Sequence, residues 1–294
     1  MMTGLALVLA ATPSQAQQAV EEQPEVRRNV VFNSVDGVDV ALDIYLPAGE
    51  SQEPRQVCLY IHGGGWQGGD KSEGEIFLRG PVQAGWVGIS TSYRLSGQAT
   101  WPAQIDDVHD CLEWISRHAE EIGADPNRIV VAGGSAGGHL ALMAGLDQRS
   151  WRKYSIIGTF SLYGPTDLLA DEWHFHQIRY MLVNLLGGDP LEDPSLARDA
   201  SPLNYADKRD VPVFMVHGDE DSIVPYSQSV AMQELLGSLG VECRLLRVPG
   251  GNHGNFDETD PDWTEIARQF LEWSNRLAGV NMEVVMEEPA STQN

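Results

Sequence analysis

The architecture of this chain follows from one stretch, Val130-Val131-Ala132-Gly133-Gly134-Ser135-Ala136-Gly137-Gly138-His139. Its apolar, β-branched start is typical of a buried strand, and the residues after the glycines have a helical pattern. A serine between two such glycines fits a sharp strand-to-helix turn, because glycine lets the backbone approach where a side chain would block it. We predict that Ser135 lies at the end of a strand, with the first amides of the next helix facing it.

Outside this turn, strand-like and helix-like segments alternate, which is the pattern of a mostly parallel sheet with crossover helices. Asp36-Gly37 separates two strand-like runs and predicts an antiparallel hairpin at the start of the fold. We expect strands at 29–33, 38–46, 56–61, 86–93, 128–132, 156–162, 211–216 and 242–248, and helices at 102–118, 139–146, 227–239 and 263–277. The predicted class is α/β, with a mostly parallel central sheet and helices on both faces.

The 294 residues are enough to bury a large core and still form one domain. We place this domain at 29–278, between a flexible segment at 17–28 and a flexible tail at 279–294. Residues 168–202 interrupt the alternation with aromatic, histidine and proline residues. A long connection of this kind is predicted to be a small lid inserted near the functional site.

The N-terminus has the pattern of an export signal. An apolar run from Gly4 to Ala11 precedes Ser14-Gln15-Ala16, a small-x-small pattern that suits signal peptidase. Residues 1–16 are therefore predicted to be a signal peptide, and the protein to be periplasmic or secreted. The run lacks a preceding Lys or Arg, and a disordered apolar tail is the alternative. No other stretch reaches the ~20 apolar residues that span a bilayer, so stable membrane insertion is not expected.

Charge and cysteine content exclude several classes of protein. Asp and Glu number 42 against 19 Lys and Arg, and the resulting net charge of -23 repels nucleic acid and anionic lipid surfaces. The three cysteines Cys58, Cys111 and Cys243 stand in apolar or helical runs and are expected to pack as small hydrophobes. His174-Phe175-His176 has no carboxylate or cysteine at ligand spacing, so we expect no metal and no other cofactor.

A second glycine-rich stretch, Tyr60-Ile61-His62-Gly63-Gly64-Gly65-Trp66, follows an earlier strand. Its glycine amides can turn inward and bind an oxyanion, with the amide after Ser135 as a further donor. We assign this oxyanion hole to Gly64, Gly65 and Ala136. A phosphate-binding loop is the alternative, but no lysine follows at P-loop spacing.

Two later loops supply a base and its acid. Gly250-Gly251-Asn252-His253-Gly254 follows a strand, and a histidine there can take the serine proton and return it to a leaving alcohol. Asp219, Glu220 and Asp221 follow the preceding strand, and one of them should orient this histidine. The other histidines, His139 and His217 among them, are expected to be structural.

Together these motifs resemble the His-Gly-Gly-Gly esterases related to hormone-sensitive lipase, and more closely the bifunctional acetylxylan esterase/feruloyl esterase-like domain group. The resemblance implies an α/β-hydrolase fold and a triad of Ser135, Asp221 and His253, because His-Gly-x-x-Asp-x-x-Val-Pro places the acid at Asp221 in related enzymes. Asp219 stays open as the alternative acid. The matching residues are Leu42 to Pro47, His62 to Trp66, Tyr93 to Leu95, Trp101 to Ala103 with Asp107, Gly133 to Gly138, Tyr163 to Pro165, Ser201-Pro202, His217 to Pro225 and Gly251 to His253.

The function predicted on this basis is a serine carboxylesterase that works through an acyl-enzyme. Its substrates are expected to be short-acyl or aryl esters, as small molecules or as acetyl or feruloyl esters of plant polysaccharide. A prolyl oligopeptidase-like peptidase is one alternative, although the chain has no room for a propeller. A non-catalytic binding protein of the same fold is another, and the oligomeric state is not indicated. Candidate substrate-binding residues are Trp66, Tyr163, Trp173 and Phe175, with ordinary packing as the alternative role; Arg94 and Asp107 are expected to form a structural ion pair.

Overall fold

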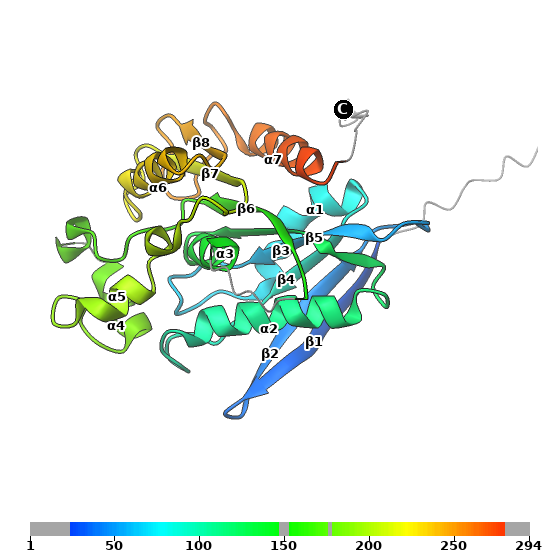
Figure 1. The fold of residues 1–294 in the computed structure, drawn as a ribbon, viewed down its shortest axis with the longest axis horizontal. Helices are drawn as coiled ribbons and strands as arrows, with labels where there is room; N and C mark the ends of the chain where they lie inside the picture. Colours follow the sequence, from blue (N-terminus) through cyan, green and yellow to red (C-terminus); the bar gives the residue numbers. More distant parts are fainter. Residues whose placement is uncertain (1–23, 147–152, 176–177, 280–294) are drawn as a thin grey trace, which may run out of the picture.

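The computed structural model describes residues 24–146, 153–175 and 178–279. Its centre is an eight-stranded sheet in the order β1-β2-β4-β3-β5-β6-β7-β8 (Figure 1). The pairs β1/β2 and β2/β4 are antiparallel and all other neighbours are parallel. The predicted fold class is therefore confirmed. The strands are β1 (Glu25–Val35), β2 (Val38–Leu46), β3 (Arg55–Ile61), β4 (Val87–Thr91), β5 (Ala124–Gly134), β6 (Ile156–Leu162), β7 (Val213–Gly218) and β8 (Cys243–Val248).

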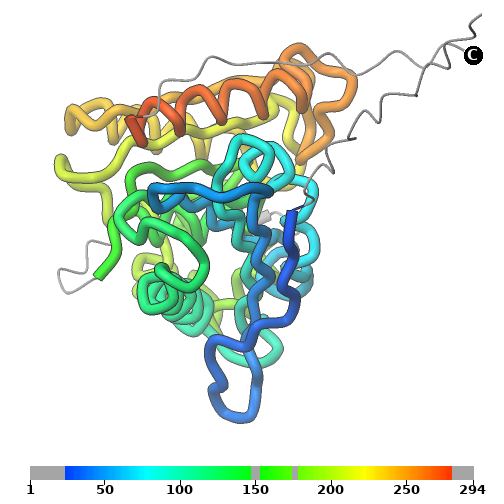
Figure 2. Tube along the Cα trace, turned by 90° about the vertical axis from the view of Figure 1, so that its right-hand side faces the viewer, coloured from blue at the N-terminus to red at the C-terminus, as the bar shows by residue number. Residues whose placement is uncertain are grey.

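Helices cover both faces of the sheet. On one face, α1 (Gly74–Gln83) and α7 (Trp263–Leu277) enclose an aromatic core built around Phe160, Phe214 and Phe270. On the other face, α2 (Ala103–His118), α3 (Ala136–Leu146) and α6 (Ser227–Ser238) pack on the aliphatic side chains of the strands. In both views α7 lies at the top of the molecule and α2 lies below it, on the other side of the central strands (Figure 1, Figure 2).

The opening hairpin and α2 form for the reasons read from the sequence. Asp36 and Gly37 both have positive φ, +52° and +80°, which is the conformation that a two-residue type I′ hairpin turn requires. In α2, Ile105, Val108 and Leu112 recur at helical spacing and are buried against the sheet.

Two segments differ from the prediction. β1 begins at Glu25, so residues 25–28 form a strand and not the flexible segment expected for 17–28. Helix α1 was not predicted, because Gly74, Gly80 and Pro81 have the character of helix breakers. The glycine at 74 is required by packing, since a Cβ there would lie 2.2 Å from Ser90 Oγ on β4.

Residues 168–202 contain the helices α4 (Ile178–Leu186) and α5 (Pro194–Asp199), with a 3₁₀ turn at Asp171–Phe175. They gather beyond the ends of the central strands (Figure 1). The role of this segment as a lid stays a prediction. Among the described residues, no helix has the length and hydropathy needed to cross a membrane.

The turn from β5 to α3 depends on backbone contacts that exclude side chains. A Cβ on Gly133 would lie 2.3 Å from the carbonyl oxygen of Gly137, and a Cβ on Gly137 would lie 2.0 Å from the carbonyl oxygen of Ile61. Ser135 itself has φ of +54°, in the left-handed region that costs energy for a residue with a Cβ. Close packing of β5, α3 and the end of β3 therefore holds the serine in this conformation.

We predict that Gly137→Ala destabilises the protein by about 3 kcal/mol, because the new methyl group must push apart two backbone segments that cannot repack. Chemical denaturation measures the change in free energy of unfolding. Gly237→Ala is the matched control: this helical glycine has no atom within 4 Å of an added Cβ, so the substitution should be neutral or slightly stabilising. Equal stability of the two variants would contradict the packing argument.

Candidate active site

Ser135, His253 and Asp221 form one hydrogen-bonded chain. The Oγ of Ser135 lies 2.9 Å from Nε2 of His253, and Nδ1 of His253 lies 2.8 Å from Oδ2 of Asp221. The three residues follow β5, β8 and β7, whose carboxyl ends meet at one edge of the parallel sheet. This edge is where open α/β sheets place their ligand sites.

The carboxylate of Asp221 is completely buried and held on both oxygens. Its Oδ1 accepts hydrogen bonds of 2.8 Å from the backbone amides of Ile223 and Val224. Burial on its own would raise the pKa of Asp221, but hydrogen bonds from His217 and His253 outweigh it and hold the pKa well below its usual range. The group therefore stays ionised and can fix the tautomer of His253.

Asp219, the alternative acid, faces another partner. Its carboxylate pairs with Arg247, 2.6 Å from Nε, and accepts the backbone amide of Gly250 at 2.7 Å. The structure therefore brings Asp221, and not Asp219, to the imidazole of His253.

The loop that carries the three glycines lies directly against the serine turn. A Cβ on Gly63 would lie 3.4 Å from the Cβ of Ser135. Gly64 and Gly65 have φ of +100° and +59°, which turns their amides away from regular pairing, and neither amide donates to a backbone carbonyl among the described residues. Ala136 is the first residue of α3, so its amide has no acceptor within the helix. These amides are available to bind a negatively charged oxygen.

Trp66 is placed differently from the prediction that it lines a substrate pocket. Its indole is completely buried and lies beneath the glycine loop, with Nε1 3.2 Å from Nδ1 of His139. The other nitrogen of His139 donates to the carbonyl of Ala200 at 2.7 Å. Because burial lowers the pKa of His139 to about 4, the ring is neutral near pH 7 and can accept the indole proton. His139 thus joins the glycine loop to the end of the 168–202 segment.

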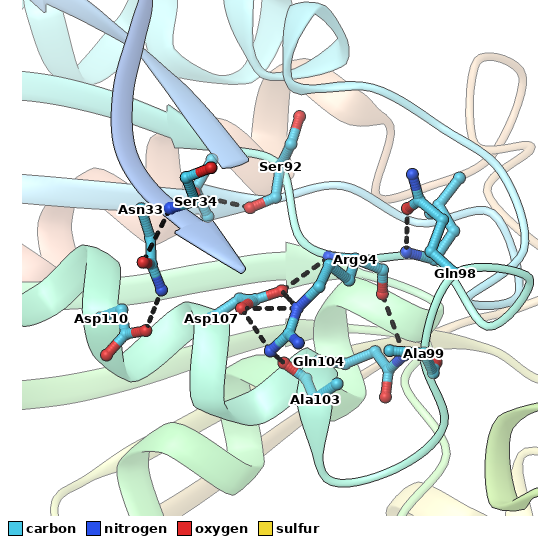
Figure 3. A network of polar contacts seen from close by, with 12 residues as sticks. Asn33, Ser34, Ser92, Arg94, Gln98, Ala99, Ala103, Gln104, Asp107 and Asp110 are labelled. Carbon is cyan, nitrogen blue, oxygen red and sulfur yellow. Dashed lines mark hydrogen bonds and ion pairs between the residues drawn. The ribbon is translucent and has the colours of Figure 1, made fainter. Parts of the chain in front are cut away.

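The ion pair of Arg94 and Asp107 anchors a neighbouring loop that is hydrogen-bonded to the glycine loop. The guanidinium of Arg94 binds both oxygens of Asp107, with Nη2 2.8 Å from Oδ1 and Nε 2.9 Å from Oδ2 (Figure 3). Asp107 also accepts the Arg94 backbone amide at 2.8 Å, so the loop after β4 is fastened to α2. That loop reaches the site through the amide of Ser96, which donates to the carbonyl of Trp66 at 2.7 Å. The predicted structural ion pair is present.

The three remaining substrate-binding candidates are placed differently from one another. Tyr163 stands beside the base: its ring centre lies 4.5 Å from that of His253, and its φ of +42° is strained for a side chain of this size. Trp173 is buried, 2% exposed, and its indole donates to the carbonyl of Asp167 at 2.6 Å. The side chain of Phe175 lies outside the described residues.

Met181 is a site residue that the sequence did not indicate. A Cβ on Gly65 would lie 2.5 Å from its sulfur, so α4 places this side chain over the glycine loop. A methionine in an ordinary amphipathic helix carries no signal of this contact, which depends on how the 168–202 segment folds back.

A cavity of about 640 Å³ lies between α1 and α7, and one of its lining residues, Tyr163, also packs on the ring of His253. A Cβ on Gly134 would lie 3.4 Å from the hydroxyl of Tyr163 and 3.5 Å from that of Tyr60, which puts both hydroxyls beside the serine turn. Most of the lining is aromatic or aliphatic, with Glu73, Arg79 and Asp257 as its charged members, and the aromatic residues are Tyr60, Phe77, Phe160, Tyr163, Trp263 and Phe270. Such a cavity suits an apolar or aromatic ligand group.

The fold and the site together define the class of α/β-hydrolases with a Ser-His-Asp constellation. The chain belongs to the BD-FAE family, which it matches over residues 42–236. This range includes Ser135 and Asp221 and ends before His253. The resemblance stated from the motifs is thus confirmed.

Individual relatives are esterases. Esterase LipQ of Mycobacterium tuberculosis is 29% identical over 208 residues, which cover 67% of this chain and 49% of LipQ. This chain therefore spans about half the length of LipQ. Among solved structures, a truncated carbohydrate esterase from gut microbiota superposes with a TM-score of 0.76 at 27% identity over 87% of this chain and 99% of that one. Esterase Est2 of Thermogutta terrifontis superposes with a TM-score of 0.72 at 25% identity, over 90% of this chain and 95% of Est2.

Proposed function

We propose that the protein is a serine carboxylesterase with Ser135 as nucleophile, His253 as general base and Asp221 as the orienting acid. The observation that carries this proposal is the unbroken hydrogen-bonded chain from Ser135 to Asp221, set against the amides of the glycine loop. The esterase relatives named above support the reaction type.

The geometry accounts for both halves of an acyl transfer. Ser135 Oγ attacks the ester carbonyl while Nε2 of His253 takes its proton, and the amides of Gly64, Gly65 and Ala136 bind the oxyanion that forms. His253 then returns the proton to the leaving alcohol. A water molecule repeats the sequence on the acyl-enzyme, which releases the acid and restores Ser135.

We propose short-acyl and aryl esters as substrates, including acetyl or feruloyl esters on plant polysaccharide. The side chain of Met181 lies over Gly65 and so leaves little space beside the oxyanion hole, which favours a small acyl group. Tyr163 joins the α1–α7 cavity to His253, the residue that protonates the leaving group, so an aromatic alcohol part is accommodated there. Carbohydrate-linked substrates draw support from the carbohydrate esterase that superposes on this chain.

Export belongs to the same proposal and rests on the pattern of residues 1–16. These residues lie outside the described ranges.

Ser135→Ala should lower kcat for p-nitrophenyl acetate by a factor of about 10⁴ or more, because no other nucleophile replaces the lost hydroxyl. A fluorophosphonate probe should label the parent protein and not this variant. Ser51→Ala, at an exposed turn, is the control and should keep both properties. Full activity in Ser135→Ala would refute the proposal, and faster cleavage of p-nitroanilides than of esters would favour a peptidase.

Asp221→Asn should lower kcat by about 10⁴, because an amide cannot hold the tautomer of His253 that accepts the serine proton. Asp219→Asn is the matched control. Its kcat should stay within about threefold of the parent value, since the ion pair of Asp219 with Arg247 is not part of the hydrogen-bonded Ser135-His253-Asp221 triad. The ester assay at pH 7 measures both. A reversed order of the two variants would move the acid to Asp219.

Ala267→Trp should fill the cavity from the exposed side of α7 and lower kcat/KM for 2-naphthyl acetate about tenfold, while ethyl acetate hydrolysis changes less than twofold. Thr264→Trp adds the same side chain to the same helix outside the cavity lining and should change neither substrate. If Ala267→Trp lowers kcat/KM for methyl ferulate and not for 2-naphthyl acetate, the cavity binds the acyl group. No change with any aryl ester would separate the cavity from substrate binding.

A further inference from the structure

His217 is a second histidine on the carboxylate of Asp221. It is the penultimate residue of β7, its side chain is completely buried, and its Nε2 lies 3.3 Å from Oδ2 of Asp221. That is the same oxygen that receives Nδ1–H of His253 at 2.8 Å. The carboxylate is therefore held between two imidazole rings that approach it from different strands.

Hydrogen bonds on both ring nitrogens define the proton position on His217. Nε2 carries the proton, because it is hydrogen-bonded to the carbonyl of Val224 at 2.9 Å and its other near neighbour, at 3.3 Å, is the carboxylate of Asp221. Nδ1 lies 2.7 Å from the hydroxyl of Ser229 on α6, which donates to it. The ring is thus hydrogen-bonded at both nitrogens and fixed in orientation, as buried polar groups must be to avoid a desolvation cost.

We propose that His217 is a positioning residue that shares the Asp221 carboxylate with His253 and thereby limits how strongly the carboxylate holds a proton on His253. This inference rests on the proposed function. The N–H of His217 draws negative charge toward itself on Oδ2, so less of that charge stabilises the protonated base. A base that is held less tightly in its protonated form remains able to accept the Ser135 proton at lower pH.

The neighbouring titratable groups do not reproduce this effect. The ring of Tyr226 packs edge-on against His217, with 5.6 Å between the ring centres, and burial raises the pKa of Tyr226. Burial also raises the pKa of Tyr163, to about 12. Both phenols are therefore neutral across the range in which a histidine titrates. Arg247, on the neighbouring strand β8, is paired with Asp219.

The test is the pH profile of ester hydrolysis by His217→Leu. Because the carboxylate then acts on His253 alone, the acidic limb of kcat/KM should move to higher pH by about one unit, with kcat lowered about tenfold and KM changed less than twofold. His217→Gln, whose amide N–H can reach toward the same carboxylate, should return most of the shift. His109→Leu is the control, because the imidazole of this buried histidine of α2 is hydrogen-bonded to the hydroxyl of Tyr154 at 3.2 Å and its loss should leave the limb in place.

A second readout does not depend on turnover. The proton between His253 and Asp221 gives a low-field resonance in ¹H NMR spectra, and the pH midpoint of its titration should rise in His217→Leu as the acidic limb does. Ser229→Ala frees the ring to turn and should shift both midpoints the same way by a smaller amount, which keeps the test informative if His217→Leu does not fold.

Unchanged midpoints in the folded variants would overturn the role of His217. Parent protein that titrates normally in the spectrum but hydrolyses no ester would instead count against the proposed function.

Discussion

Backbone approaches backbone so closely at the turn after β5 that no side chain fits between them. The Cα of Gly137 faces the carbonyl of Ile61, and this contact brings the end of β3 against the first turn of α3. The glycine loop that continues β3 therefore stands beside Ser135, and the amides of both elements can face the same reacting atom. A looser turn would leave a serine and a glycine loop with no common centre.

Further contacts transmit this arrangement outward. Arg94 and Asp107 anchor the loop after β4, which holds the glycine loop from below, while His139 ties Trp66 to the 168–202 segment. On the opposite side, two imidazoles and two amides converge on Asp221. The hydroxyl of Ser135 and the imidazole of His253 are thus surrounded by groups that several contacts hold in place. This is the preorganisation that catalysis by charge stabilisation requires.

Prediction from sequence succeeded where local pattern and chemistry agree. The Asp36-Gly37 hairpin and the spacing of Ile105, Val108 and Leu112 each depend on residues close in the chain. It failed where packing overrides local preference: α1 forms despite Pro81, and Trp66 is enclosed in the core although an aromatic beside a glycine loop suggests a pocket. Met181 gave no signal, because a common residue type in a regular helix acquires its role only from a distant neighbour, Gly65. His217 stands in the motif that contains Asp221, but its contact with the carboxylate was not predicted.

The sequence by itself determined the fold class, the family, and the residue types from which a Ser-His-Asp site could be built, since periodicity, glycine turns and motif order are local properties of the chain. Only the tertiary structure decided which carboxylate meets His253, which aromatic side chains face a cavity and which are buried, and that a second imidazole shares Asp221. Those outcomes depend on distances between side chains in the folded protein, and such distances are set by packing of the sheet, its loops and its helices.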